Sequence, residues 1–260
     1  MADGTPAVLK IAPPWDDIGQ QIRTMMAAHG HGYACVYEYD PDRRAALVES
    51  LGPSLEDAGA PVEEQLEILA RTLRDAWRVP LATAPPVQAG EDKAVQLIGL
   101  LVDLWDSLGQ PCSRLLRDTA LRYAQRRAEA FDPDRCVVCH GDPHSASALA
   151  TGVRRAGTES STSTSFKEYR FVDPDGFRCD PGYDLGVVMR GWPETVLAAE
   201  DPVRRTRSWA SWLAAATGIV EQVIVEWAFV ERVTSGLYLL RHGHHDEDRA
   251  YLDSAEALLP

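Results

Sequence analysis

The chain has 260 residues, with 26 Lys and Arg against 39 Asp and Glu, which gives a formal net charge of −13. Hydrophobic residues make up 45% of it, so disordered, collagen-like and disulfide-dense small proteins are excluded. The acidic balance disfavours nucleic acid as a partner, and no apolar run reaches the ~18 residues that span a bilayer. The amino terminus does not read as a signal peptide and the five cysteines are an odd number, so we expect a cytoplasmic protein with reduced thiols.

The hydrophobic pattern predicts a short β-rich segment at the amino terminus. Residues 7–12 form a strand-like run, and apolar residues at helical spacing follow over residues 15–28. Two further strand-like runs, at 33–39 and 45–51, flank an Asp-Pro-Asp turn typical of a hairpin. We therefore expect a reduced first domain over residues 1–51.

Helical patterns dominate the second expected domain, residues 52–260, and prolines separate them. The predicted helices cover residues 62–77, 93–108, 112–131, a stretch from 183, and then 204–215, 219–241 and 246–258. Two apolar runs of strand length, at 136–139 and 169–173, interrupt this series. The segment between them, 151–167, is rich in Ser, Thr and Gly and predicts an exposed loop.

Polar residues follow both of these short strands. The stretch CHGDPHSASAL, from Cys139 to Leu149, offers no apolar face, and FVDPDG places Asp173 directly after the second strand. Asp142 and Asp173 thus lie at the ends of two strands that could be neighbours. Phosphoryl transfer needs two such carboxylates: one orients an attacking hydroxyl and accepts its proton, and the other holds Mg²⁺ against the nucleotide phosphates. Either aspartate alone would be an ordinary turn residue.

The stretches HGDPHSASAL and FVDPDGFRCDPGYDLGVVMRGW resemble the aminoglycoside phosphotransferases, in particular the branch with streptomycin 6-phosphotransferases and hydroxyurea kinases. The specific likeness covers residues 139–192, while AVLKI and LVESLGPSL resemble the lysine-bearing strand and the inter-lobe hinge. The resemblance implies a protein-kinase-like, two-lobed α+β fold with a truncated amino-terminal β lobe. The mainly helical carboxy-terminal lobe would hold the catalytic and metal loops within residues 136–192.

The activity that this resemblance implies is transfer of the γ-phosphoryl group of ATP to a hydroxyl of a small polar molecule. An aminoglycoside antibiotic similar to streptomycin is the expected acceptor class, with hydroxyurea as another acceptor. The implied cofactors are ATP and Mg²⁺. The net charge of −13 favours a cationic acceptor.

The resemblance also implies roles for single residues. Asp142 would be the catalytic base, His140 would brace its loop, and Asp173 would bind Mg²⁺. Lys10 would contact the α- and β-phosphates of ATP. Backbone groups from Glu49 to Leu51 would hydrogen-bond the adenine. Asp184, at the start of a helix, would hold the catalytic loop in place.

The chain departs from the family in three ways. Ser147 stands where the family has a metal-binding Asn, and its side chain is shorter. Gln21 stands where a Glu should pair with Lys10, and Asp16 and Asp17, about one turn earlier, are the alternative partners. Only nine residues precede the lysine, enough for one strand at ~3.3 Å per residue, so either the chain begins late or the nucleotide is less covered.

Two other functions stay open at this level. These departures are compatible with a degenerate kinase that binds nucleotide or ligand without turnover. Cys136, Cys139 and His140 match the C-x-x-C-H pattern of haem attachment, which we interpret as a chance match on a buried strand. A zinc site that adds His144 is a poor alternative, because alternate positions of a strand face opposite sides.

Overall fold

The structure is a computed structural model that describes residues 4–13, 18–152, 168–243 and 245–259. Most of the predicted 151–167 loop and the first part of the predicted 15–28 helix lie outside these ranges, as do the candidate partners Asp16 and Asp17. None of the helices within the described ranges has the length and apolar content needed to cross a bilayer.

The chain divides into two compact units. The first unit contains Met1–Pro85 and Val137–Phe177, and the second contains Pro86–Cys136 and Arg178–Pro260. This division differs from the predicted boundary after residue 51. Backbone hydrogen bonds explain the difference, because the chain just after residue 51 is tied to the segment of the polar loops: Gly52 N–H donates to the Ala150 carbonyl and Leu55 N–H to the Ala148 carbonyl.

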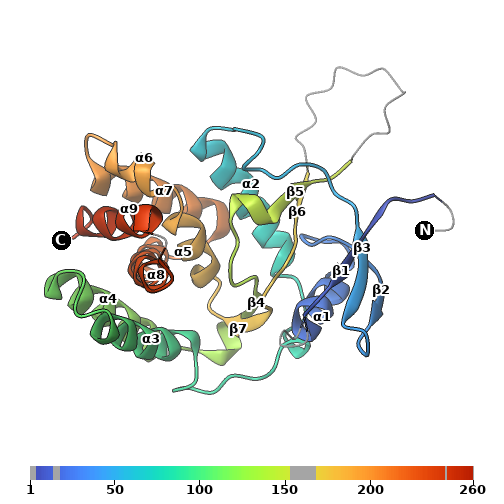
Figure 1. Ribbon diagram of the computed structural model, residues 1–260, viewed down its shortest axis with the longest axis horizontal. Helices are drawn as coiled ribbons and strands as arrows, with labels where there is room; N and C mark the ends of the chain where they lie inside the picture. The colour runs from blue at the N-terminus through green and yellow to red at the C-terminus, as the bar shows by residue number, and fades with distance from the viewer. Residues whose placement is uncertain (1–3, 14–17, 153–167, 244, 260) are drawn as a thin grey trace. The chain divides into compact units, whose positions relative to one another are not determined.

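An antiparallel sheet of strand order β1-β3-β2 forms the amino-terminal part of the first unit (Figure 1). Its strands and the helix beside it are β1 (Ala7–Ile11), α1 (Gly19–Ala28), β2 (Val36–Asp40) and β3 (Ala45–Glu49). The helix contacts β2 and buries Ile22 and Met25, two of the apolar positions expected from the sequence, whereas Met26 is exposed. Lys10 pairs with Ala46 across the β1–β3 ladder, so its backbone is fixed in the middle of the edge strand β1.

The rest of the first unit supplies the polar loops and the elements that support them. These are α2 (Val62–Ala76), η1 (Leu81–Thr83), β4 (Val137–Cys139), η3 (Ser145–Ser147), β5 (Ala148–Ala150) and β6 (Tyr169–Phe171). Strand β7 (Phe177–Cys179) begins at the last residue of this unit and continues into the second. The strands β5 and β6 pair antiparallel. The sequence did not predict β5 and β7, because three residues are too few to show an alternating pattern and, unlike β4 and β6, neither lies in one of the apolar runs found in the sequence. Tyr33, predicted within a strand, instead forms an isolated bridge with Phe171.

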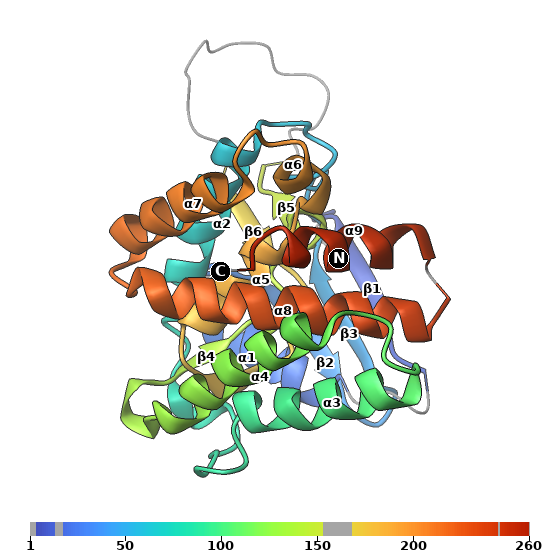
Figure 2. The ribbon, with the colours of Figure 1, turned by 90° about the vertical axis from the view of Figure 1, so that its left-hand side faces the viewer.

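Helices make up the second unit, and α8 lies at its centre (Figure 2). The elements are α3 (Lys93–Ser107), α4 (Arg114–Glu129), η2 (Pro133–Arg135), α5 (Gly182–Arg190), α6 (Pro193–Leu197), α7 (Pro202–Thr217), α8 (Glu221–Arg241) and α9 (His245–Glu256). Contacts of α8 with α3, α4, α5, α7 and α9 bury Leu101, Leu116 and Phe229, among others. A Cβ at Gly186 would come within 2.7 Å of the Trp227 backbone, so the glycine of the YDLG stretch permits the close approach of α5 to α8.

Candidate active site

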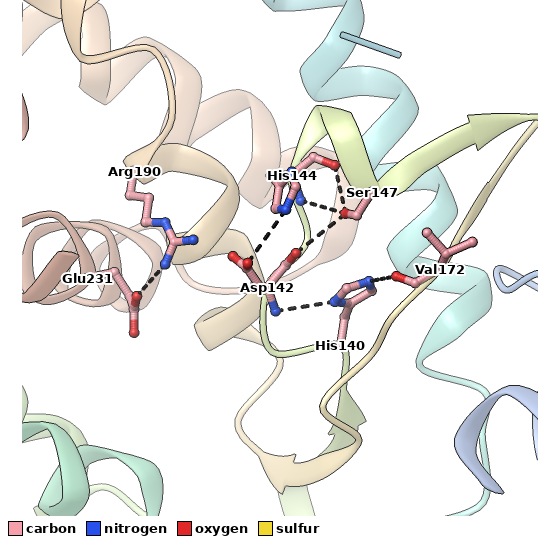
Figure 3. Close-up of polar contacts among 7 residues, drawn as sticks. All are labelled: His140, Asp142, His144, Ser147, Val172, Arg190 and Glu231. Atoms are coloured by element: carbon pink, nitrogen blue, oxygen red, sulfur yellow. Dashed lines mark hydrogen bonds and ion pairs between the residues drawn. The ribbon is translucent and has the colours of Figure 1, made fainter. Parts of the chain in front are cut away.

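His140 connects the two polar loops of the first unit (Figure 3). It follows β4 directly, and its Nδ1 accepts a hydrogen bond from the N–H of Asp142 at 3.2 Å. Its Nε2 lies 3.1 Å from the carbonyl oxygen of Val172. Because a carbonyl can only accept, Nε2 carries the proton and the imidazole is neutral. One side chain therefore orients the backbone at Asp142 and at the residue before Asp173.

The surroundings of His140 keep it neutral. Burial lowers its pKa to about 4, an effect that the charges of Asp142 and Asp173 offset only in part. The ring of Tyr33 stacks on it with centroids 5.9 Å apart, and Phe171 meets it edge-on at 4.8 Å. These rings exclude water, which disfavours the imidazolium form. The two hydrogen bonds of His140 therefore persist at neutral pH.

The loop after His140 packs tightly against the residues that follow Asp173. Gly141 has a φ of 95°, and a Cβ there would lie 2.4 Å from a carboxylate oxygen of Asp175. The N–H of Asp175 donates to the His140 carbonyl at 2.7 Å. Glycine is thus required in the HGD stretch both for its backbone conformation and for this close approach. The structure brings the loops of Asp142 and Asp173 together through these contacts, although β6 pairs with β5 and not with β4, so the two preceding strands are not the neighbours that the sequence suggested.

The carboxylate of Asp142 is 47% exposed and has a neighbour that the sequence analysis did not include in the site. His144 Nε2 lies 3.5 Å from Asp142 Oδ2, and the His144 side chain is also about half exposed. Both side chains belong to the same short loop (Figure 3). The nearby imidazole limits the directions in which the carboxylate can turn. The spacing HGDPH could have indicated this pair, because a tight turn brings its ends together.

Ser147, the predicted metal ligand, is bonded to the backbone of its own loop. Its hydroxyl accepts from the His144 N–H at 3.1 Å and donates to the His144 carbonyl at 2.9 Å, with the Asp142 carbonyl at 3.4 Å. The carbonyl of Ser147 also accepts from the N–H of Val172 at 3.0 Å, which ties the loop to the strand before Asp173. A metal role for Ser147 stays a prediction: one lone pair of its hydroxyl oxygen is not used by these bonds, while the bonds fix the hydroxyl within its loop.

Lys10 reaches Gln21, which the sequence analysis placed beside it, and also Asp173, which the sequence analysis did not pair with it. Its ammonium forms an ion pair with Oδ1 of Asp173 and donates to Oε1 of Gln21 at 2.5 Å. The three residues come from β1, the loop after β6 and α1. Asp173 has a φ of 60°, a left-handed conformation that costs free energy for a non-glycine residue, and its side chain is 58% exposed. The backbone of Asp173 thus has an unusual conformation, and the carboxylate of this residue points toward Lys10.

The predicted adenine-binding segment is held by an arginine that the sequence analysis did not select. Oε2 of Glu49 accepts from Arg170 Nη1 at 2.5 Å and from the N–H of Cys35 at 3.0 Å. The N–H of Glu49 donates to the Cys35 carbonyl at 2.8 Å. Arg170 lies on β6, three residues before Asp173, so this ion pair links the end of β3 to the strand of the metal loop. Leu51 follows β3 and is half-buried; its contact with adenine stays a prediction.

Asp184 and the two cysteines of the C-x-x-C-H pattern, which the sequence analysis also considered, are all buried. Asp184 is fully buried in the first turn of α5, within the second unit, and its support of the catalytic loop stays a prediction. Cys136 and Cys139 are both buried. Burial raises the pKa of Cys136 to about 12, so it remains a thiol rather than the thiolate that binds metals.

The donors around Asp173 fit a magnesium ion of the kind that bridges nucleotide phosphates. Asp173 and Asp142 offer partly exposed carboxylate oxygens, the hard donors that Mg²⁺ prefers. No group of three or more His, Cys, Asp or Glu arranged to hold a metal occurs among the described residues. A magnesium ion at Asp173 would therefore complete its coordination with phosphate oxygens and water, as is common for this ion.

Solved structures of kinases share this architecture. Aminoglycoside phosphotransferase APH(3'')-Id of Streptomyces rimosus, solved with ADP and streptomycin, aligns with a TM-score of 0.51 and 18% identity over 88% of this chain and 87% of that one. Choline kinase LicA of Streptococcus pneumoniae gives 0.57 and 12% over 98% and 86%. A choline/ethanolamine kinase family protein of Mesorhizobium loti gives 0.56 and 18% over 96% and 79%. These likenesses confirm the predicted protein-kinase-like α+β fold.

The comparison of sequences identifies the family. A family model described as aminoglycoside/hydroxyurea antibiotic resistance kinase matches residues 1–243. Streptomycin 6-kinase of Streptomyces glaucescens is 26% identical over 259 residues, which cover 98% of this chain and 78% of the relative. Together with the loops described above, these matches confirm the resemblance found in the sequence. The chain belongs to the aminoglycoside/hydroxyurea antibiotic resistance kinase family and is a kinase-type O-phosphotransferase.

Proposed function

We propose that this protein transfers the γ-phosphoryl group of ATP to a hydroxyl of a cationic aminoglycoside, with streptomycin as the first acceptor to test. The observation that supports this most is the contact of Lys10 with both Gln21 and Asp173, in the unit that also holds the Asp142 loop. A lysine, a metal-binding carboxylate and a second carboxylate for the acceptor are the parts that phosphoryl transfer requires.

In this proposal Asp142 orients the acceptor hydroxyl and takes its proton while the oxygen forms a bond to the γ-phosphorus. The bond between the γ-phosphorus and the β,γ-bridging oxygen breaks, and ADP leaves. Lys10 exchanges its ion pair with Asp173 for the α- and β-phosphates, which frees Asp173 to bind Mg²⁺. The bound magnesium supplies charge neutralisation at the phosphates. His140 holds the loops of Asp142 and Asp173 in place relative to each other during these steps.

The proposed acceptor class rests on charge and on relatives. The net charge of −13 would attract a polycation such as an aminoglycoside, and the relative from Streptomyces glaucescens is a streptomycin kinase. Hydroxyurea is small and neutral, so its capture would not depend on salt. We expect the KM for streptomycin to rise as ionic strength increases. A KM that does not change with salt would contradict the electrostatic part of the proposal.

The test is a phosphoryl-transfer assay with Mg²⁺·ATP and either streptomycin or hydroxyurea, read out as ADP release and as phosphate gained by the acceptor in mass spectrometry. Asp142→Asn should lower kcat by about 10³-fold, within the range expected for loss of general base catalysis, while nucleotide binding is retained. Asp118→Asn is a matched control, since Asp118 is an exposed aspartate of the second unit. Transfer that persists undiminished in Asp142→Asn would refute the assigned mechanism.

A nucleotide-binding protein without turnover is the second candidate. It is favoured by the hydroxyl of Ser147, which is bonded to its own loop, and by the neutral Gln21 beside Lys10. Binding of Mg²⁺·ATP with no Asp142-dependent transfer to either acceptor would support it. The variant Ser147→Asn should then raise magnesium affinity by restoring an amide ligand. An unchanged dependence on Mg²⁺ in that variant would mean that position 147 does not bind the metal.

A further inference from the structure

A glutamine next to Gln21 contacts the loop that carries Asp173. Nε2 of Gln20 donates to the carbonyl of Gly176 at 2.8 Å and lies 3.2 Å from the carbonyl of Thr83. Its Oε1 accepts from Nε and Nη2 of Arg23, at 3.3 and 3.1 Å. Because a guanidinium can only donate, Arg23 fixes the orientation of the amide and directs its nitrogen toward the loop.

The loop also packs directly on α1 at this point. Gly176 is buried with a φ of 71°, and a Cβ there would lie 2.2 Å from Oγ1 of Thr24 and 3.2 Å from Nε2 of Gln20. The last residue of the VDPDG stretch is therefore glycine because the helix leaves no room for a side chain. The contact between α1 and the loop is a close, hydrogen-bonded one.

Two adjacent glutamines of α1 thus have different partners. Gln21 accepts from Lys10, and Lys10 pairs with Asp173 at the start of the loop. Gln20 binds the carbonyl of Gly176 at the end of the same loop. Neighbouring residues of a helix point about 100° apart, so one turn of α1 can reach both the lysine and the loop. These contacts form a closed ring from α1 through Lys10 and Asp173 and back to α1.

We propose that Gln20 is a positioning residue that holds the loop of Asp173 against α1 and so sets the place of this carboxylate relative to Lys10. The link is useful here because Gln21 is neutral and its contact with Lys10 lacks the charge attraction of a carboxylate–lysine pair. Gln20 does not touch the reacting groups; it acts through the loop backbone. The consequence for magnesium rests on the function proposed above.

The variant Gln20→Glu tests this, because a carboxylate cannot donate to the Gly176 carbonyl and brings an acceptor against another acceptor. Hydrogen exchange followed by mass spectrometry should show amides of residues 171–177 exchanging about fivefold faster, as expected for loss of one hydrogen bond. Calorimetry should show Mg²⁺·ADP binding weakened by about fivefold and metal-free ADP binding unchanged. Gln96→Glu is the matched control, since Gln96 donates to the Glu91 carbonyl in the second unit.

The variant Arg23→Met provides a second measurement if Gln20→Glu folds poorly. It removes the group that orients the amide while leaving Gln20 in place, so both effects should have the same direction and be smaller. Unchanged exchange in the loop of either folded variant would overturn the proposal. Faster exchange with unchanged Mg²⁺·ADP binding would also overturn it, since Gln20 would then only support the fold. A wild-type protein that binds no Mg²⁺·ADP would instead refute the proposed function, and loop exchange would still decide whether Gln20 holds the loop.

Discussion

Charged residues are placed differently in the two units. In the second unit, the side chains of Glu226 and Glu231 on α8 are 2% and 5% exposed and form ion pairs with arginines. In the first unit, the carboxylates of Asp142 and Asp173 are about half exposed. A buried ion pair has fixed partners, whereas an exposed carboxylate can exchange its partner for a ligand. We infer that the buried charges support the fold and that the exposed ones belong to the reaction.

The largest effect should come from the exposed site. Asp173→Asn should lower kcat by about 10³-fold, or ~4 kcal/mol, because it removes the carboxylate proposed to hold magnesium. Its free energy of unfolding should change by less than about 1 kcal/mol, since Asn tolerates the left-handed conformation and the ion pair with Lys10 is partly exposed. Turnover and urea unfolding, measured together, check this. Strong destabilisation with intact turnover would reverse the roles inferred for the two units.

The buried pair should behave in the opposite way. Glu226→Leu removes the carboxylate 2.6 Å from Arg127, whose side chain is 13% exposed, and leaves this arginine only the more distant Asp180, at 3.9 Å. We expect a loss of roughly 3 kcal/mol in the free energy of unfolding, measured by urea titration, and an unchanged kcat per folded molecule. Adding Arg127→Met should restore most of the stability, because it removes a buried charge that has lost its nearer partner. A double variant no more stable than Glu226→Leu would mean that the cost lies in packing rather than charge.

His140 should connect stability to pH. Its pKa is lowered from the ordinary 6.5 to about 4, so the unfolded state binds a proton at a pH where the folded state does not. Stability from this group is therefore complete above about pH 6.5 and declines as the pH falls toward 4, by roughly 3 kcal/mol in total. Urea unfolding of wild type and His140→Gln between pH 7.5 and 4.5 isolates the contribution. Parallel pH profiles for the two proteins would contradict it.

The smallest effect should come from Gln21→Glu. A carboxylate at position 21 would compete with Asp173 for the ammonium of Lys10, which Gln21 now contacts at 2.5 Å. Asp173 would then be freer to bind metal, and the Mg²⁺ concentration for half-maximal activity should fall about threefold, in line with the small energy of an exposed ion pair. Magnesium titration at saturating ATP measures this. A higher Mg²⁺ requirement would mean that the neutral glutamine is needed where it is.

Several parts of the molecule could be predicted because their signals are local. Leu66, Leu69 and Leu73 recur at helical spacing, and all three are buried in α2. The polar stretches around Asp142 and Asp173 follow short strands, and the structure brings these loops together through His140. Local pattern and motif were sufficient to predict the helix and the two polar loops, whereas the contact between the loops spans 32 positions of the chain.

Other parts could not be predicted from spacing. Gln20 and Arg170 look like ordinary surface residues in the sequence, and their partners show why they are not. The burial of the two acidic residues of α8 could not be predicted either, because a charged residue in a helix normally indicates a solvent-exposed face. Glu226 and Glu231 are buried only because arginines from α4 and α5 meet them.

The sequence by itself determined that this chain has a small sheet, many helices and two aspartate loops of kinase type. Only the tertiary structure decided which side chains meet around those loops. Lys10 and Asp173 are 163 positions apart along the chain, and the sequence around neither residue indicates that the two are in contact. Such a contact depends on how β1, α1 and the loop after β6 pack, so it emerges from the packing of whole elements rather than from any one stretch of residues.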